Sequence, residues 1–256
     1  MHWTEEEVPL ADDIKDFNNA DADEVRFITE VLRLFTQNDI MVGAGYDVML
    51  RIFKPTEVQM MLRTFANREN THISAYALLT ETLGFGDEIY SEFLEIPLME
   101  GKTEYIDKAK VKKFEDYKAD GMSNAQVDEQ FRRAIARMLA VYAGATEGIS
   151  LMAQFAMLLQ YQFQNKYKGM CTIVDWSIKD EAQHQEGNSK LFREYIKENS
   201  DIWDDELKYD IYQAVREIVE YEKSLVDYLN PPHMDKDTVK TYIEYMADNA
   251  LKQLGM

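Results

Sequence analysis

The sequence predicts an all-α protein, a bundle of long helices with additional flanking helices. Only five prolines and 11 glycines occur among the 256 residues, and apolar residues mostly recur with the spacing of an amphipathic helix. Hydrophobic residues make up 46% of the chain and charged residues 29%, which is typical of a globular protein with a substantial core. We expect one domain over residues 1–256, with residues 1–20 forming an N-terminal arm.

Composition also limits the classes of partner. The formal net charge of -19 argues against a general nucleic-acid surface or an anionic-membrane surface, and it suits the binding of hard cations. Cys171 is the only cysteine, so the chain has no internal disulfide and no cysteine-based zinc site, as expected in a reducing cytosol. The start of the chain, Met1-His2-Trp3-Thr4, runs into acidic residues and does not read as a signal peptide.

Capping and breaking residues divide the chain into helices. A short helix is expected in the arm, and a first long helix opens near Asp21 or Asp23 and runs toward Met49. Lys54-Pro55 then breaks the chain before a helix that reaches about Leu83. Residues 87–120 show a weaker pattern, which we expect to form a peripheral crossover. Helical periodicity then covers four further ranges, about 123–166, 171–198, 203–229 and 235–254.

Two features stand out inside the helix predicted over residues 123–166. Residues 143–148, with the sequence Ala-Gly-Ala-Thr-Glu-Gly, form a soft spot suited to a kink or a π-bulge, and such bulges often occur at functional sites. The apolar run after it, residues 149–163, is interrupted by three glutamines and is too short to cross a membrane. This run is expected to be a central helix, buried on most sides.

A Glu-x-x-His pattern occurs twice, as Glu69 with His72 and as Glu181 with His184. Residues three apart on a helix share one face, so the carboxylate and the imidazole of each pair can bind one metal ion from the same side. One such pattern is expected by chance in a chain this rich in glutamate. The two together use half of the four histidines, and this makes a metal site the better interpretation.

Two single carboxylates on other predicted helices, Asp39 and Glu147, complete a possible set of six ligands. Two lone carboxylates and two Glu-x-x-His helices are the pattern of ferritin-like di-iron and di-manganese bundles. Four carboxylates offset most of the charge of two divalent ions, and Glu69 and Glu181 can bridge them. Each residue alone is more often a surface acid or a core histidine, but six inward-facing groups without metal would be costly. The predicted ligands are Asp39, Glu69, His72, Glu147, Glu181 and His184.

With these residues in place, the chain resembles the radical-generating small (β) subunit of class I ribonucleotide reductase, in the compact form of phages and bacteria. The resemblance covers nearly the whole chain, through the stretches 2–7, 35–39, 69–76 and 179–187 and Glu147. Asp39 stands where ferritins and bacterial multicomponent monooxygenases usually have Glu. Tyr76 lies one turn beyond His72, at the family's radical tyrosine, and Trp3 matches a tryptophan on the family's electron route. Asp180 can accept a hydrogen bond from the second nitrogen of His72.

The resemblance implies a mechanism. A reduced di-metal centre activates O₂ and oxidises Tyr76 to a neutral radical, with Leu151 and Phe155 as candidate walls around it. During turnover the oxidising equivalent passes through His72, Asp180 and Trp3 to a separate large (α) subunit, which reduces ribonucleoside diphosphates or triphosphates. Two iron ions (Fe/Fe) are favoured, with Mn/Mn or Mn/Fe open, as is the need for a flavoprotein activase. Core packing is the simpler role for Tyr76, Leu151 and Phe155, and anchoring of the N-terminal arm is the simpler role for Trp3.

The resemblance also implies a homodimer in the cytoplasm, or in the host cytoplasm if the chain is phage-encoded, with no direct contact to nucleic acid or membrane. The family's C-terminal tail carries a tyrosine and the docking peptide for the large subunit, whereas this sequence stops at Gly255-Met256, where the last predicted helix ends; either the tail is not included in these 256 residues or docking differs here. Tyr242 and Tyr245 lie within the last predicted helix and are expected to be structural. The part of the radical path that crosses to the large subunit is therefore left unassigned.

Three other functions compete with this one. A ferritin-like oxidase or oxygenase would use the same metals on a small organic substrate, and it would need a substrate cavity but neither Trp3 nor Asp180. An iron-storage bundle would not need Tyr76 or helices beyond four. A plain helical scaffold does not explain the concentration of acids and histidines.

Overall fold

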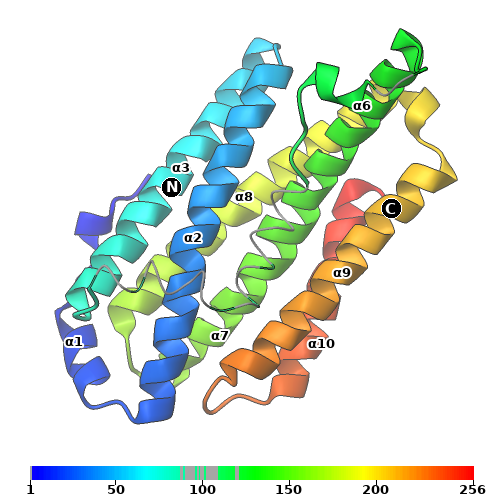
Figure 1. Cartoon of the computed structure of the whole chain (residues 1–256). Helices are drawn as coiled ribbons and strands as arrows, with labels where there is room; N and C mark the ends of the chain where they lie inside the picture. Colours follow the sequence, from blue (N-terminus) through cyan, green and yellow to red (C-terminus); the bar gives the residue numbers. More distant parts are fainter. Residues whose placement is uncertain are drawn as a thin grey trace.

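The computed structural model describes residues 2–86, 89, 96, 98, 101, 109–118 and 121–256, and for residues 36–41 and 143 the backbone only. All regular structure in these residues is helical, so the predicted all-α class is confirmed. Helices α2 and α3 pack along each other, and α8 packs against α3, α6 and α7 (Figure 1). Helices α9 and α10 pack on each other and on the helical segment η4, and they form the flanking layer at the right of Figure 1.

The predicted helices are present, with boundaries close to those expected. The N-cap of α2 is Asp21, whose side chain accepts a hydrogen bond from the backbone N–H of Glu24 at 2.9 Å. The expected short helix of the arm is α1. The elements are η1 (Glu5–Glu7), α1 (Ala11–Asn18), α2 (Ala22–Ile52), α3 (Thr56–Thr82), η3 (Phe114–Tyr117), α6 (Asn124–Ala140), η4 (Val141–Ser150), α7 (Leu151–Phe163), α8 (Lys168–Glu198), η5 (Ser200–Ile202), α9 (Asp205–Leu229) and α10 (Lys236–Leu254).

Helix α8 begins at Lys168, three residues before the predicted start at Cys171. Its N-terminal N–H groups are satisfied from a distant part of the chain, because the buried carboxylate of Asp13 accepts from Gly169 N at 3.0 Å and from Met170 N at 2.7 Å. A cap supplied by α1 leaves no local signal at the start of α8. The same two bonds hold the N-terminal arm against the bundle.

The segment η4 (Val141–Ser150) is a π-helix that joins α6 to α7 without a break. It covers the whole of the expected soft spot at residues 143–148, and the predicted departure from α-helical geometry is confirmed. Its described side chains are buried, and it contacts α6, α7, α8, α9 and α10. The segment that carries Glu147 therefore lies at the centre of the molecule, between the bundle and the flanking layer.

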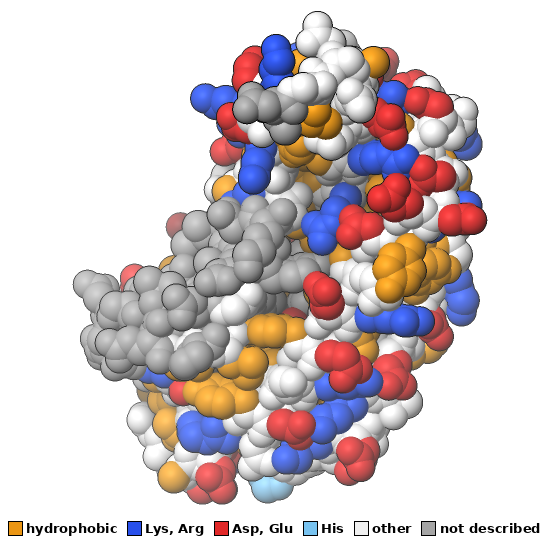
Figure 2. Space-filling model, turned by 45° about the vertical axis from the view of Figure 1, so that its right-hand side comes forward, with side chains coloured by type: hydrophobic (Ala, Val, Ile, Leu, Met, Phe, Trp, Pro, Cys, Tyr) orange, Lys and Arg blue, Asp and Glu red, His pale blue; other side chains and the backbone are white. Residues whose placement is uncertain are grey.

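Charged side chains cover much of the visible surface outside the grey region of Figure 2, with hydrophobic patches among them. On the face that Figure 2 shows, acidic and basic side chains alternate, in agreement with ion pairs such as that between Lys223 of α9 and Glu244 of α10 at 2.7 Å. Among the described residues, no helix is long and apolar enough to cross a membrane. The peripheral crossover expected over residues 87–120 falls largely outside the described residues.

Candidate metal centre and the residues around it

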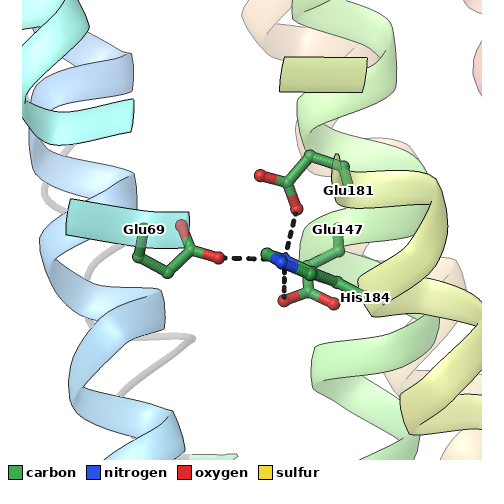
Figure 3. A group of neighbouring side chains, drawn as sticks. All are labelled: Glu69, Glu147, Glu181 and His184. Atoms are coloured by element: carbon green, nitrogen blue, oxygen red, sulfur yellow. Dashed lines mark ion pairs between the residues drawn. The ribbon is translucent and has the colours of Figure 1, made fainter. Parts of the chain in front are cut away.

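Four buried side chains from three helical segments meet in the core. One ligand atom from each of Glu69, Glu147, Glu181 and His184 lies within 4.8 Å of all the others. Figure 3 shows Glu69 reaching across from α3 toward Glu181 and His184 of α8, with Glu147 of η4 beside them. The glutamates of both Glu-x-x-His patterns, the histidine of the second pattern and one lone carboxylate are thus brought together.

His72 joins this cluster from α3. Its Nδ1 lies 3.0 Å from Glu181 Oε1 and 3.7 Å from Glu69 Oε2. The Nδ1 atom of His184 lies 3.1 Å from Glu69 Oε1 and 3.2 Å from Glu181 Oε2. Glu69 and Glu181 therefore each stand between the two imidazoles, where a bridging carboxylate would have to be.

Glu147 belongs to one side of the cluster. Its Oε1 lies 3.7 Å from His184 Nδ1, and the π-helix aims it at that histidine. The remaining predicted ligand, Asp39, lies in α2, but its side chain is outside the described residues. Five of the six predicted ligands are therefore placed in one cluster.

The protonation of the cluster is strongly perturbed. Burial, together with the charges of Glu181 and Glu69, raises the pKa of Glu147 to about 8 against the opposing effect of His184. Burial also disfavours the charge of Glu181, but the two histidines outweigh it and lower the pKa of Glu181 to about 2. Burial acts against the charged form of both histidines, yet the surrounding carboxylates raise the pKa of each well above its usual value.

The donor set fits divalent cations. Apart from the ion pairs, neither oxygen of Glu69 or Glu181 and neither ring nitrogen of His184 has a hydrogen-bond partner among the described residues, although all are buried. Buried polar atoms are rarely left without a partner in folded proteins. Carboxylate oxygens and imidazole nitrogens are ligands for iron, manganese and zinc. A metal pair among these side chains would satisfy the unpartnered atoms.

Asp180 links the cluster to the N-terminal arm. Its Oδ2 lies 3.3 Å from His72 Nε2, the contact predicted from sequence, and it also accepts a 2.8 Å hydrogen bond from the indole of Trp3. The Trp3 ring stacks near the His72 ring, with centroids 5.9 Å apart. Burial opposes the charge of Asp180, but the bonds from His72 and Trp3 and the nearby Arg68 lower its pKa. An indole and an imidazole thus meet at a single carboxylate oxygen.

Tyr76 is buried one turn beyond His72. Its ring stacks on Phe35 at 4.7 Å between centroids, and Phe35 stacks in turn on Phe155 at 5.1 Å. Its hydroxyl lies 3.4 Å from Ser177 Oγ. Of the two predicted wall residues, Phe155 acts through Phe35, which was not predicted from sequence as a wall, and Leu151 lies in the same core cluster.

Sequence reasoning missed two residues that bind Glu147. The hydroxyl of Tyr46 donates to Glu147 Oε1, and the amide of Asn188 donates to Glu147 Oε2 at 3.1 Å. Burial beside Glu147 and the other carboxylates raises the pKa of Tyr46 well above its usual value, so the hydroxyl keeps the proton that it donates. Asn188 lies four residues after His184 on α8, a spacing that could have indicated it.

A surface pocket of about 470 Å³ reaches the His184 side of the cluster. Its lining includes Arg63, Phe65, Arg68, Asp180 and His184. It carries two arginines on a strongly acidic protein, and it connects the surface with a side chain of the cluster.

Comparison with known proteins agrees with this geometry. The family model "Ribonucleotide reductase, small chain" matches residues 1–256. The chain is 36% identical to a probable ribonucleoside-diphosphate reductase small subunit of Invertebrate iridescent virus 6, over 99% of this chain and 77% of that protein. It is 25% identical to the ribonucleoside-diphosphate reductase subunit beta of Chlamydia pneumoniae, over 100% of this chain and 74% of that protein.

Solved structures share the fold. A putative class I ribonucleotide reductase from Bacillus halodurans superposes with a TM-score of 0.89 at 18% identity, covering 100% of this chain and 88% of that one. An R2-like ligand-binding oxidase with a Mn/Fe cofactor superposes with a TM-score of 0.74 at 16% identity, covering 98% and 88%. The predicted ferritin-like architecture is confirmed by these likenesses. From the family match and the viral relative together, the chain belongs to the ribonucleotide reductase small-chain family.

Proposed function

We propose that this chain is the radical-generating subunit of a ribonucleoside-diphosphate or ribonucleoside-triphosphate reductase and that it works with a separate large subunit. Membership of the small-chain family implies that partner. The observation that carries the proposal is the Trp3–Asp180–His72 contact, because a hydrogen-bonded path from the cluster to the N-terminal arm has no use in an enzyme that works entirely within its own core.

Two metal ions are proposed between α3, η4 and α8, with Asp39 of α2 as a further ligand. Glu69 and Glu181 lie between both histidines, so either carboxylate could hold both ions. His72 and Glu147 would each hold one ion, from opposite sides of the cluster. Two iron ions are our choice, and Mn/Mn and Mn/Fe are the competing pairs, since a solved structural neighbour holds Mn/Fe. Anomalous diffraction at the iron and manganese edges distinguishes these pairs.

Bound there, a redox-active metal pair supplies, together with O₂, the oxidising power needed to take one electron from a phenol. The chain provides that phenol as Tyr76. The Tyr76 ring is held flat against Phe35 in the core and is 1% exposed, which keeps water and external reductants away from its radical form. Loss of an electron and of the hydroxyl proton leaves a neutral radical, and Ser177 Oγ is the hydroxyl beside that oxygen.

During turnover one electron passes from the large subunit toward the Tyr76 radical, along the path that Trp3, Asp180 and His72 provide. Asp180 uses one oxygen for both hydrogen bonds, so the indole and the imidazole are coupled through a single atom. Arg68 lies 3.9 Å from the same oxygen and stabilises its negative charge. Asp180 thus orients the indole of Trp3 and the imidazole of His72 and accepts the hydrogen bonds of both, while Arg68 stabilises its charge.

The first test compares two single variants, Tyr76→Phe and Trp3→Phe, with the wild-type chain. Iron(II) is added without oxygen, air is admitted, and the radical is followed by electron paramagnetic resonance and by the tyrosyl absorption band. We expect Tyr76→Phe to lose the radical while still binding metal. Trp3→Phe should keep the radical and lose turnover with the large subunit. A tyrosyl radical that survives in Tyr76→Phe would refute the assignment.

A second candidate, an oxidase or oxygenase for a small organic molecule, is favoured by one observation, the 470 Å³ pocket that reaches His184. It predicts product formation without any partner and no effect of Trp3→Phe on that product. Incubation of the metal-loaded chain alone with O₂ and candidate substrates separates the two functions.

The proposal extends to assembly and location. We place a homodimer in the cytoplasm, or in the host cytoplasm if the chain is phage-encoded, because its substrate would be drawn from the nucleotide pool there. Sedimentation of the purified chain tests the dimer.

A further inference from the structure

We infer that Tyr46 and Asn188 are positioning residues that hold Glu147 in one orientation and so set the affinity of the metal position beside His184. The inference rests on the proposed metal centre and goes beyond it, because it assigns unequal properties to the two metal positions. It concerns three side chains from three segments, Tyr46 of α2, Glu147 of η4 and Asn188 of α8.

The three groups form a closed ring of hydrogen bonds. Tyr46 donates its one hydroxyl proton to Glu147 Oε1, and its oxygen accepts from Asn188 Nδ2 at 3.1 Å. The same amide nitrogen donates to Glu147 Oε2 at 3.1 Å. Each carboxylate oxygen thus receives one donor from the protein. Each also keeps lone-pair capacity for a metal ion, because a carboxylate oxygen accepts about two bonds.

The orientation of the amide is determined by its neighbours. With the amide reversed, its carbonyl oxygen would face a carboxylate oxygen and a phenol oxygen whose proton is already used. The nitrogen carries two protons, one for each of these two oxygens. Asn188 is fully buried, and so are Tyr46 and Glu147. No bulk water is therefore at hand to replace the bonds when one partner is removed.

Packing fixes the Tyr46 ring independently of its hydroxyl. The ring meets Phe65 edge-on at 5.9 Å and His184 edge-on at 5.9 Å between centroids. These contacts do not involve the hydroxyl, so Tyr46→Phe retains the packing and removes one donor. A change in metal binding in that variant therefore reports on the donor.

Glu147 differs in this respect from the two carboxylates between the histidines. Apart from ion pairs with the imidazoles of His72 and His184, the oxygens of Glu69 and Glu181 have no hydrogen-bond partner among the described residues. Glu69 and Glu181 are thus paired only with the two histidines, whereas Glu147 is held by two donors from outside the predicted ligand set. Removal of such outer partners typically lowers metal affinity or activity by about 10- to 100-fold.

The experiment is an anaerobic titration of the metal-free chain with Mn(II) alone. Free Mn(II) is counted by its electron paramagnetic resonance signal, and the spin-coupled signal of the bound pair is recorded in parallel. Tyr46→Phe and Asn188→Ala remove the two donors separately. Tyr161→Phe is the matched control, because it removes a fully buried phenol hydroxyl whose ring packs on Phe27 and Tyr167.

We expect Tyr161→Phe to bind two ions, each with the same affinity as in the wild-type chain. Tyr46→Phe and Asn188→Ala should each weaken one of the two ions by about 10- to 100-fold and alter the coupled signal. Because both donors act on one carboxylate, the double variant should lose less than the product of the single effects. Circular dichroism identifies a variant that fails to fold, and the other variant then decides.

Unchanged affinities for both ions in the folded variants overturn the inference, as does equal weakening in Tyr161→Phe. Wild-type protein that binds no Mn(II) overturns the proposed metal centre itself, and this inference with it. The failure of the inference and the failure of the proposed function are thus distinguishable by the wild-type titration.

Discussion

The two imidazoles of the cluster have different surroundings. His72 uses its Nδ1 toward the carboxylates and its Nε2 toward Asp180, so the ring is held at both nitrogens. His184 meets three carboxylates with Nδ1, while its Nε2 has no hydrogen-bond partner among the described residues and its ring lies 4.5 Å from that of Phe65. On the His184 side it is the carboxylate Glu147 that is held instead.

This difference indicates a division of labour between two otherwise similar Glu-x-x-His helices. Around His72, Asp180 connects the anchored imidazole to the indole of Trp3 in the N-terminal arm. Around His184, Tyr46 and Asn188 hold the carboxylate of Glu147 within the core. The outer partner fixes and tunes whichever ligand it binds. Each side is therefore open to a separate perturbation.

The largest effect is expected when Glu181, the carboxylate close to both histidines, is removed. Glu181→Ala takes away a carboxylate that contacts both histidines, so we expect both ions to be weakened by at least about 100-fold, more than the loss of an outer partner causes. Mn(II) titration measures this directly. Retention of one ion at full affinity would show that Glu181 serves one side only.

A smaller effect is expected when the anchor on the His72 side is weakened. Asp180→Asn keeps the shape of the side chain but removes the charge that lies 3.3 Å from His72 Nε2. We expect a loss of about 10- to 100-fold in affinity for one ion. In combination with Tyr46→Phe, the two losses should multiply, because they act on different ions. Weakening of the same ion by both changes would contradict the comparison.

An effect of similar size, on stability instead of metal affinity, is expected for Trp3→Phe. The substitution deletes a buried hydrogen bond to a charged carboxylate, and such bonds contribute about 1.5–3 kcal/mol. Denaturant unfolding of the metal-free chain should show a loss of this order. The affinities for both ions should stay within a few fold, since the bond of Asp180 to His72 remains. A large loss of metal would mean that the indole is needed to place His72.

The smallest effect is expected at Asp13, which caps α8 far from either histidine in sequence. Asp13→Ala removes the acceptor of two backbone N–H groups and should lower the free energy of unfolding by about 1–2 kcal/mol. Asp13→Ala should leave the ratio of the two metal affinities unchanged. If it weakened one ion alone, the N-terminus of α8 would be part of the asymmetry.

Much of the fold could be predicted from sequence, because local signals decide most helix ends. Asp21 caps α2 as expected, and the glycine-containing stretch before Glu147 does leave α-helical geometry. The start of α8 could not be predicted, because its cap comes from Asp13 in another helix. The ligands in the two Glu-x-x-His helices could be predicted, because their three-residue spacing has a direct geometric meaning.

The surroundings of those ligands were harder to predict. Tyr46 and Phe35 are ordinary core residues in the sequence of α2, and only tertiary packing gives one a bond to Glu147 and the other a stack on Tyr76. The role of Asp180 could be predicted from sequence, because Asp180 directly precedes the predicted ligand Glu181. Asp39 stays a prediction, since its side chain is outside the described residues.

The π-helix at residues 141–150 has a consequence for how this chain can vary in length. A wider turn holds more amino acids per unit of length than an α-turn does, and each extra residue rotates the helix beyond it by about 100°. Shortening this segment would let it rewind into a regular helix and swing the Glu147 carboxylate away from its partners. A one-residue deletion in this segment is therefore expected to separate Glu147 from Tyr46 and Asn188 while the helices around it keep their packing.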